Sequence, residues 1–281
     1  MKTFIKFFSI IILLVSFAAC DVIDNPLKEG GTRPPVDSTV VVRKVIIEDF
    51  TGHRCKNCPY AAEKIHELQD VYGKNVIGIA IHEGPSNFTG TNADYPTDFT
   101  TDDGKTIYDF FKIPALPMGM VSRIDYTGTG TSHLKTYSGW PAISAGLLDS
   151  VAHIKLEALV GYESSTRTVT VDVAATALID FSDDLKVVVM ILESGIVSPQ
   201  LMPDDTRNAN YIHQHVLRKA FTQAMGDELA LSPILTGAIH TKQIIGTVDA
   251  AWVADNCDIV VFVYNDRTKE ILQAEQLALI P

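Results

Sequence analysis

The hydrophobic pattern of this chain changes near residue 152, and the change limits the folds that the chain can adopt. Before residue 152, apolar runs and a segment of helical period follow one another in the order strand, helix, strand. After it, short segments alternate between apolar and polar residues, which is typical of antiparallel β-structure. The pattern therefore predicts an α/β domain over residues 39–151 and an all-β domain over residues 152–281.

Three segments define the core of the first domain. The β-branched run Val40–Ile47 predicts a strand, and apolar spacings of three and four over Pro59–Tyr72 predict a helix. The mostly apolar run Asn75–His82 predicts a second strand that is buried on both faces. This order predicts a parallel strand pair with a right-handed crossover. Four further elements are expected: helices at 106–111 and 140–151, and strands at 118–126 and 133–137.

The second domain has the spacing of a β-sandwich. Its many short strand candidates, separated by turn residues, predict an immunoglobulin-like antiparallel β-sandwich. The segment 211–225 fits either a helix or a strand. The strand candidates are residues 154–160, 168–173, 185–193, 243–248, 259–264 and 271–279.

The first twenty residues have the pattern of an export signal. Lys2 and Lys6 precede the apolar run Phe7–Ala19, which is shorter than the about 20 residues of a membrane span. Cys20 follows this run directly, and the segment Ser16–Cys20 resembles the lipobox of bacterial lipoproteins. In that family a peptidase cuts before the cysteine, which then carries the lipid. The alternative is an ordinary secretory signal peptide with a coincidental cysteine.

Cleavage before Cys20 would remove residues 1–19 and leave residues 20–38 as a polar tether with Gly and Pro breakers. The net charge of −11 would become more negative by the two lysines that the signal peptide carries. Such an acidic protein has neither the basic face of a nucleic-acid-binding protein nor an electrostatic attraction to anionic lipid. The lipid on Cys20 would therefore provide the membrane anchor.

Cys55 and Cys58 are three residues apart, where the first strand gives way to the helix. In this setting a C-x-x-C pair is typical of a redox motif. The free N–H groups and partial positive charge of a helix N-terminus favour the thiolate, and His53, Arg54 and Lys56 add positive charge. Cys55, at the exposed cap position, would be the attacking thiolate, and Cys58 the resolving thiol.

Two other interpretations of this cysteine pair remain open. Half of a zinc site would need two more ligands in a matching pair, and Cys257 alone does not supply them. A structural disulfide in an exported protein would have the same sequence pattern. The sequence therefore predicts no metal or cofactor, and it leaves both a redox-active and an inert disulfide open.

The segment from Asp49 to Cys58 resembles the active-site segment of the thioredoxin family, and Phe110–Pro117 resembles the later segment that ends in a cis-proline. The resemblance implies a thioredoxin-like fold for the first domain. It also implies that Pro117 is the cis-proline, which packs against the reactive disulfide and pairs with substrate peptide. Asp49 corresponds to the family's buried acid beneath the resolving cysteine, with Glu48 as the alternative.

Three segments together resemble outer-membrane lipoproteins related to the 28-kilodalton outer membrane protein: Glu48–Pro59, Leu116–Arg123 and Tyr211–Arg218. This resemblance spans nearly the whole mature chain and implies a location at the outer membrane. The expected activity is thiol–disulfide exchange on exported proteins that carry thiols or disulfides, with an unidentified redox partner. The alternative is a non-enzymatic binding or structural lipoprotein with an inert disulfide.

Several other polar residues have simpler expected roles. Cys257 begins an apolar run and is expected to be a buried small residue. His213 and His215 would share a face only on a strand, and structural hydrogen bonds are expected for them. His82 and Glu83 end a parallel strand, where they would line the disulfide cleft or lead into a loop. Four acidic residues without the spacing of a calcium loop are expected to be solvated: Asp94, Asp98, Asp102 and Asp103.

Overall fold

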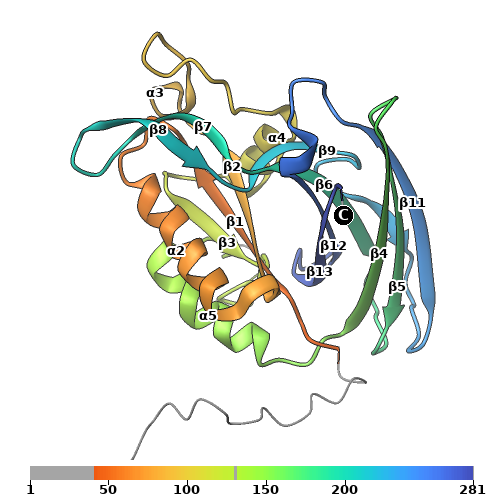
Figure 1. The fold of residues 1–281 in the computed structure, drawn as a ribbon. Helices are drawn as coiled ribbons and strands as arrows, with labels where there is room; N and C mark the ends of the chain where they lie inside the picture. The colour runs from red at the N-terminus through yellow and green to blue at the C-terminus, as the bar shows by residue number, and fades with distance from the viewer. Residues whose placement is uncertain (1–40, 130–131, 281) are drawn as a thin grey trace, which may run out of the picture. The chain divides into compact units, whose positions relative to one another are not determined.

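The computed structural model describes residues 41–129 and 132–280, which form a mixed α/β fold that is mostly β-structure (Figure 1). The predicted signal peptide, Cys20 and the tether lie outside the described residues. Residues 41–281 cluster as one compact unit. Within the described ranges, no helix is long and apolar enough to cross a membrane.

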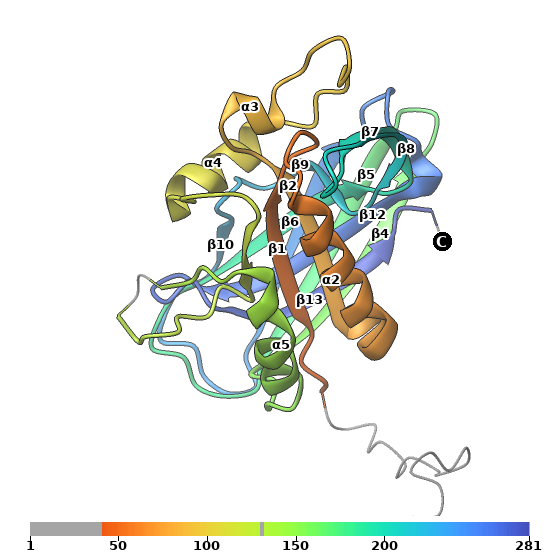
Figure 2. The ribbon, with the colours of Figure 1, turned by 90° about the vertical axis from the view of Figure 1, so that its left-hand side faces the viewer.

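The predicted strand, helix and strand near the N-terminus are present with small shifts. They are β1 (Val45–Thr51), α2 (Cys58–Tyr72) and β2 (Val76–His82). β1 and β2 run parallel, as a crossover through α2 requires. α2 and α5 (Trp140–Leu148) cover one face of this strand pair, as Figure 2 shows. Both strands are buried because the opposite face belongs to a second hydrophobic cluster.

One eight-stranded sheet contains strands from both sides of residue 152. Its order is β13-β12-β6-β9-β2-β1-β3, and β10 pairs with β6. β9 joins the two parts because it pairs with β2 in parallel at Ala80–Val216 and with β6 in antiparallel fashion. The bounds of the strands not yet given are β3 (Met118–Val121), β6 (Leu185–Glu193), β9 (Val216–Ala220), β10 (Asp227–Ala230), β12 (Cys257–Asn265) and β13 (Ile271–Ala278).

The boundary predicted at residues 151 and 152 therefore marks a change in the kind of secondary structure. The hydrogen-bonded sheet itself continues across that boundary. That residues 39–151 fold independently stays a prediction.

A smaller three-stranded sheet packs on one face of β6 and β12. Its order is β11-β5-β4, with bounds Ile239–Thr247, Thr168–Ala177 and Ile154–Glu163. The alternation predicted for these segments turns Val169 and Val171 inward, where they join Val187 of β6 and Ile259 of β12 in one core. The second half thus consists of two sheets packed face to face, with the smaller sheet on the right in Figure 1.

Some element boundaries differ from the sequence-based expectation. α4 (Asp102–Phe111) begins four residues earlier than predicted because the Thr101 hydroxyl accepts the N–H of Gly104 and caps the helix. β3 ends before Ser122 and Arg123, whose φ angles of 46° and 50° are left-handed. In place of the strand predicted at 133–137, Lys135 forms an isolated bridge with Gly119.

The segment predicted ambiguously at 211–225 contains the end of one strand and all of the next. Within the described residues, β8 (Arg207–His213) pairs with β7 (Ile196–Leu201) alone, and these two strands form a separate hairpin. β9 follows in the same segment. The remaining short helices are α3 (Ser86–Thr89) and single 3₁₀ turns at Gly73–Asn75, Tyr137–Gly139 and Ala254–Asn256.

A buried ion pair lies inside the large sheet. Glu48 on β1 accepts hydrogen bonds from Arg123 Nε at 2.7 Å and from Nη2 at 2.6 Å, and both side chains are almost fully buried. The guanidinium carbon lies 5.2 Å from the ring centroids of Phe111 and Phe262 and 5.5 Å from that of Tyr264. Because Phe262 and Tyr264 belong to β12, the pair connects the two halves of the chain.

The first and last strands of the sheet order approach each other around this pair. The backbone N–H of Ile271, at the start of β13, donates to the carbonyl of Ser122, just after β3, at 2.8 Å. The Lys44 N–H donates to Gln273 Oε1 at 2.8 Å, and Arg43 Nη2 donates to the Ile271 carbonyl at 3.0 Å. The large sheet therefore curls around its own core.

Replacing Glu48 by Gln is expected to destabilise the fold by about 3–5 kcal/mol, because Arg123 would stay buried without a charged partner. The double variant Glu48→Leu with Arg123→Met should recover most of this loss, since it leaves no buried charge. Urea unfolding followed by circular dichroism measures both effects. Asp109→Asn, which breaks an exposed pair with Lys105, is the control and should hardly move the midpoint. Equal midpoints for Glu48→Gln and Asp109→Asn would contradict the assigned role of the pair.

Candidate functional site

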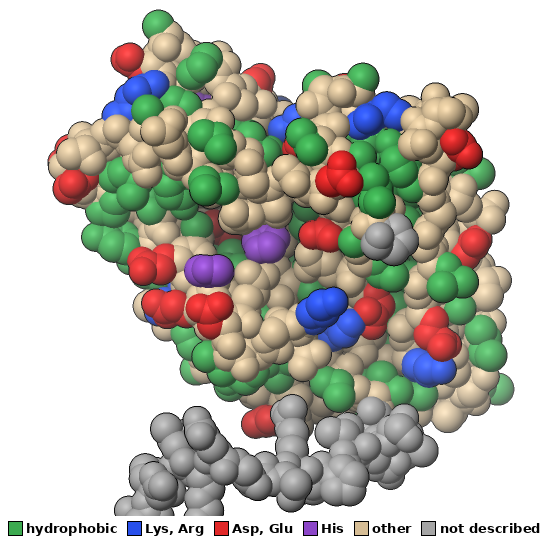
Figure 3. Space-filling view, viewed as in Figure 1, with side chains coloured by type: hydrophobic (Ala, Val, Ile, Leu, Met, Phe, Trp, Pro, Cys, Tyr) green, Lys and Arg blue, Asp and Glu red, His purple; other side chains and the backbone are tan. Residues whose placement is uncertain are grey.

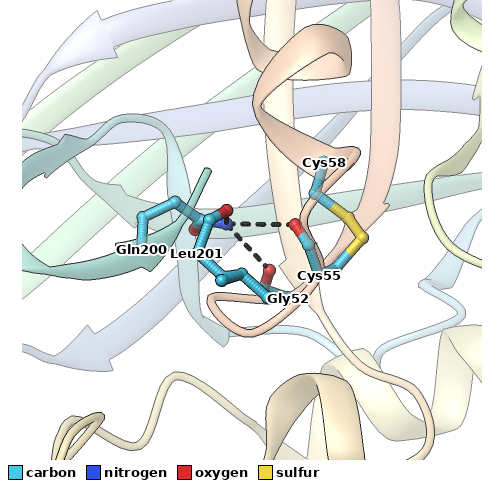
Figure 4. The surroundings of a disulfide bond; sticks show 5 residues. All are labelled: Gly52, Cys55, Cys58, Gln200 and Leu201. Carbon is cyan, nitrogen blue, oxygen red and sulfur yellow. Dashed lines mark hydrogen bonds between the residues drawn. A yellow bond between two sulfur atoms is a disulfide. The ribbon is translucent and has the colours of Figure 1, made fainter. Parts of the chain in front are cut away.

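Cys55 and Cys58 form a disulfide at the N-terminal end of α2, with their Cα atoms 5.4 Å apart (Figure 4). β1 ends at Thr51 and α2 begins at Cys58, so the connecting loop carries Cys55. Pro59 occupies the first turn of α2, where a missing N–H costs no hydrogen bond. The strand–loop–helix junction predicted from the sequence thus holds the disulfide.

The prediction that Cys55 occupies the exposed cap of this helix is wrong. Asn57 is the N-cap residue, and Cys58 is the first residue of the helix. Cys55 and Cys58 are only 3% and 2% exposed. Solvent therefore has little access to either cysteine.

The β7–β8 hairpin covers the loop that carries Cys55. Gln200 Nε2 donates to the Cys55 carbonyl at 3.2 Å and to the Gly52 carbonyl at 3.4 Å, as Figure 4 shows. The Leu201 N–H donates to the His53 carbonyl at 2.8 Å. These bonds attach a strand from the second half of the chain directly to the backbone of the disulfide loop.

The positive charges predicted to assist Cys55 have other partners. Lys56 Nζ forms an exposed ion pair with Asp205, in the hairpin turn, at 2.9 Å. Arg54 Nη1 donates to the Gly90 carbonyl at 3.2 Å. His53 is buried, and burial lowers the pKa of its imidazole. These three side chains hold the loop in place, and none is free to pair with a thiolate in this conformation.

A cavity of about 660 Å³ lies beside the disulfide and is lined by residues of α2, the ends of β1 and β2, and the hairpin. Cys58 lines it, whereas Cys55 does not. Acidic and histidine side chains gather over α2 on this face, which Figure 3 shows in the view of Figure 1. The cavity brings together residues far apart in sequence, among them Asp49, His82 and Tyr211.

Asp49 is the buried acid of this cavity. It is 1% exposed, and its Oδ1 atom has no hydrogen-bond partner in the part of the chain that the structure describes. Burial raises the pKa of this carboxyl to about 8. Successive strand residues face opposite sides, so Glu48 points to Arg123 while Asp49 lines the cavity with Cys58. The geometry thus distinguishes the two acids that the sequence left as alternatives.

Aromatic and histidine rings in tilted and edge-to-face contacts lie at the site; His82, Tyr211 and His213 line the cavity, and Phe99 packs against the two histidines. Ring centroids lie 4.6 Å apart for His82 and Phe99, 4.6 Å for Phe99 and His213, and 4.8 Å for Tyr211 and His213. Burial lowers the pKa of His82 well below its usual value and that of His213 to about 4, so both are neutral at neutral pH. Sequence reasoning missed Phe99 and Tyr211, because nothing local marks loop and edge-strand rings as neighbours of a distant disulfide.

The structure also tests the predictions for His213 and His215 and for the four acidic residues. His213 Nε2 lies 3.3 Å from the Ser198 carbonyl, and His215 Nε2 lies 3.1 Å from Gln69 Oε1, so both make the expected hydrogen bonds. His215 lies after β8, so the two do not share a strand. Asp94, Asp98 and Asp102 are exposed, as expected, whereas Asp103 is half-buried and accepts the Ala220 N–H at 2.8 Å. Among the described residues, no group of three or more His, Cys, Asp or Glu is arranged to hold a metal.

The remaining candidates lie apart from the cavity lining. The Leu116–Pro117 peptide bond is cis, and Pro117 directly precedes β3. Cys257 is a free, buried cysteine whose Sγ lies 3.3 Å from the Val253 carbonyl, and burial raises its pKa to about 12. The prediction that Cys257 is a buried small residue is confirmed.

Comparisons with known proteins give a family and a fold. The family model of outer membrane protein Omp28 matches residues 104–280. HBP35 of Porphyromonas gingivalis has a TM-score of 0.63 at 20% identity, over 85% of this chain and 76% of that chain. An Agrobacterium tumefaciens protein has a TM-score of 0.51 at 12% identity, over 85% and 96% of the two chains. These two likenesses concern the fold alone.

A domain of the outer membrane lipoprotein Omp28 from Porphyromonas gingivalis gives a TM-score of 0.32 at 21% identity, over 46% of this chain and 90% of that chain. None of the curated proteins matches the sequence.

Asp49→Asn is expected to stabilise the protein increasingly as the pH rises from about 4 to about 8. The folded state keeps the Asp49 proton up to about pH 8, whereas the unfolded chain loses it near the ordinary value of 3.8. The free energy of unfolding of the wild type therefore falls across this pH range. The difference between the unfolding free energies of Asp49→Asn and the wild type should grow by at most about 1.4 kcal/mol per pH unit.

Denaturant unfolding at a series of pH values measures this difference. Asp70→Asn, which changes an exposed carboxyl on α2, should follow the wild type. If the difference in unfolding free energy between Asp49→Asn and the wild type does not change with pH, Asp49 is ionised in the folded protein.

Proposed function

Because the chain belongs to the Omp28 family of outer membrane proteins, we propose that it is a lipid-anchored envelope protein that performs thiol–disulfide exchange on exported proteins. The observation that carries the proposed activity is the position of Asp49, a buried carboxyl that shares a cavity with Cys58. A purely structural disulfide has no use for such an acid, and burying an unpartnered polar atom costs free energy. With a pKa of about 8, Asp49 can accept and release a proton near neutral pH, as thiol–disulfide exchange requires.

The strand arrangement supports a thioredoxin-like fold for the first part of the chain. β1 pairs with β2 in parallel and with β3 in antiparallel fashion, and the disulfide lies where β1 passes into α2. The cis bond before Pro117 lies at the position that the thioredoxin resemblance implied. The two sheets of the second part, packed face to face, support an immunoglobulin-like sandwich.

In the proposed reaction, the Cys55 thiolate of the reduced protein attacks a client disulfide, forming a mixed disulfide and releasing one client thiolate. Cys58 gives its proton to ionised Asp49 and attacks the sulfur of Cys55. This second step releases the other client thiolate and forms the Cys55–Cys58 bond, so two electrons pass to the client. The β7–β8 hairpin must move aside for a protein client, because Gln200 covers the Cys55 loop. Pro117 would hold the client segment beside the cysteines.

A second candidate function is a binding or structural lipoprotein with an inert disulfide. The burial of both cysteines and the contacts of Gln200 favour it. In that case, the hairpin would be a permanent cover, and no client would reach the disulfide.

Insulin reduction by dithiothreitol, followed as turbidity, distinguishes the two functions. The wild-type protein should accelerate the reaction, and Cys55→Ser should not. Asp49→Asn should slow the catalysed rate by about 100-fold, the lower end of general acid–base effects. Gln200→Ala should raise the rate severalfold, because each hydrogen bond that is lost reduces the stability of the closed hairpin by about 1 kcal/mol. Gln243→Ala, on β11, is the matched control. Identical rates for wild type and Cys55→Ser would leave the inert disulfide as the function.

Anchoring is tested separately, through the cysteine that ends the apolar run. Cys20→Ser should abolish the incorporation of labelled fatty acid and release the protein in soluble form, because no other residue is proposed to carry lipid. Cell fractionation and metabolic labelling measure this. Fatty-acid incorporation at the wild-type level in Cys20→Ser would exclude Cys20 as the lipid attachment site.

A further inference from the structure

The cavity contacts the disulfide at Cys58, whereas the sequence predicted Cys55 as the exposed cysteine. Cys58 lines it, while the loop of Cys55 is covered by Gln200 and Leu201 of the hairpin. A small molecule in the cavity would therefore lie next to Cys58, although this side chain is only 2% exposed. A volume of about 660 Å³ is typical of small-molecule sites and excludes a folded protein.

Three buried polar atoms of the lining lack a hydrogen-bond partner among the described residues: Asp49 Oδ1, His82 Nδ1 and His215 Nδ1. The side chains of Asp49 and His82 are only 1% and 4% exposed. Buried polar groups are rarely left unpaired, because each costs desolvation free energy. A ligand with hydrogen-bond donors would supply the missing partner of Asp49.

The charges of the lining select the kind of ligand. Glu63 lies at the exposed side, and Asp49 lies at the buried end. No lysine or arginine is among the cavity's lining residues, all of which belong to the described part of the chain. His82 and His213 are neutral, because burial opposes their protonation. A cationic ligand would pair with Asp49 in its ionised form, whereas an anionic ligand would be repelled by Asp49 and Glu63; His66 and His215 also line the cavity.

We propose that this cavity binds low-molecular-weight aminothiols, which reduce the Cys55–Cys58 disulfide by attack at Cys58. The inference rests on the exchange activity proposed above, and it adds the chemical class of the reductant. The ammonium group donates to Asp49 Oδ1, and the thiol lies toward Cys58.

The reaction balances with two aminothiol molecules. The thiolate of the first attacks Cys58 Sγ, the bond between the two cysteines breaks, and Cys55 leaves as a thiolate. A second aminothiolate attacks the sulfur of the bound aminothiol and releases Cys58 as a thiolate. The products are the reduced protein and one aminothiol disulfide, and the two thiol protons pass to Cys55 and Cys58.

Reduction rates with three matched thiols test this proposal: cysteamine, which is cationic, 2-mercaptoethanol, which is neutral, and 3-mercaptopropionate, which is anionic. Each rate is divided by the rate of the same thiol with hydroxyethyl disulfide, which removes the intrinsic reactivity of the thiolate. The normalised cysteamine rate should exceed that of 3-mercaptopropionate by about tenfold or more. Asp49→Asn with Glu63→Gln should abolish this ratio, and Glu67→Gln, on α2 but outside the lining, should preserve it.

The site of attack is tested with single-cysteine variants. The free Cys58 of Cys55→Ser should react faster with cystamine than with 3,3′-dithiodipropionate, and the free Cys55 of Cys58→Ser should show no such preference. The reverse pattern would overturn attack at Cys58.

Failure of this inference can be told apart from failure of the proposed function. Equal normalised rates for the three thiols, with insulin reduction intact, would overturn the aminothiol site alone. A charge preference that survives in Asp49→Asn with Glu63→Gln would likewise overturn its assignment to this cavity. No reduction of the folded protein by any thiol, while the urea-unfolded protein is reduced, would overturn both proposals.

Discussion

The buried pair of Glu48 and Arg123 is the contact on which the arrangement of this protein depends. It places two opposite charges inside the curled sheet, where they pair with each other and the guanidinium lies over three aromatic rings. Because neighbouring residues of a strand face opposite sides, fixing Glu48 inward turns Asp49 toward α2 and the cavity. Two of the rings belong to β12, so the same contact that orients the site also joins the N-terminal and C-terminal parts of the chain.

The site is correspondingly a product of both parts. The first part supplies the disulfide and Asp49, and the second part supplies the β7–β8 hairpin that covers Cys55 and contributes Tyr211 and His213 to the cavity. This division gives the two cysteines different surroundings: the β7–β8 hairpin covers the loop of Cys55, and Cys58 lines a cavity of small-molecule size. Protein clients and small thiols would then reach one disulfide by separate routes.

The parts of this structure that the sequence predicted are those with strong local signals. The C-x-x-C pair at a strand–helix junction and the periodic helix after it needed no distant contacts to be recognised. The hairpin was missed because β7 contains Pro199 and β8 begins with the mostly polar segment Arg207–Asn210, so neither shows a clear alternation of apolar and polar residues. The burial of Cys55 was not predicted either, because the hairpin residue that contacts its loop, Gln200, lies about 150 residues away in sequence. The choice between Glu48 and Asp49 also needed the tertiary partner, since both lie on one strand.

The central claim is that the Cys55–Cys58 disulfide is exchanged and is not a permanent staple. The most direct measurement is its equilibrium reduction potential in the otherwise unchanged protein, obtained by equilibration with glutathione and alkylation of the free thiols. The account predicts a potential above about −300 mV, where exchange-active disulfides lie. A potential below about −300 mV, typical of structural disulfides, would contradict it.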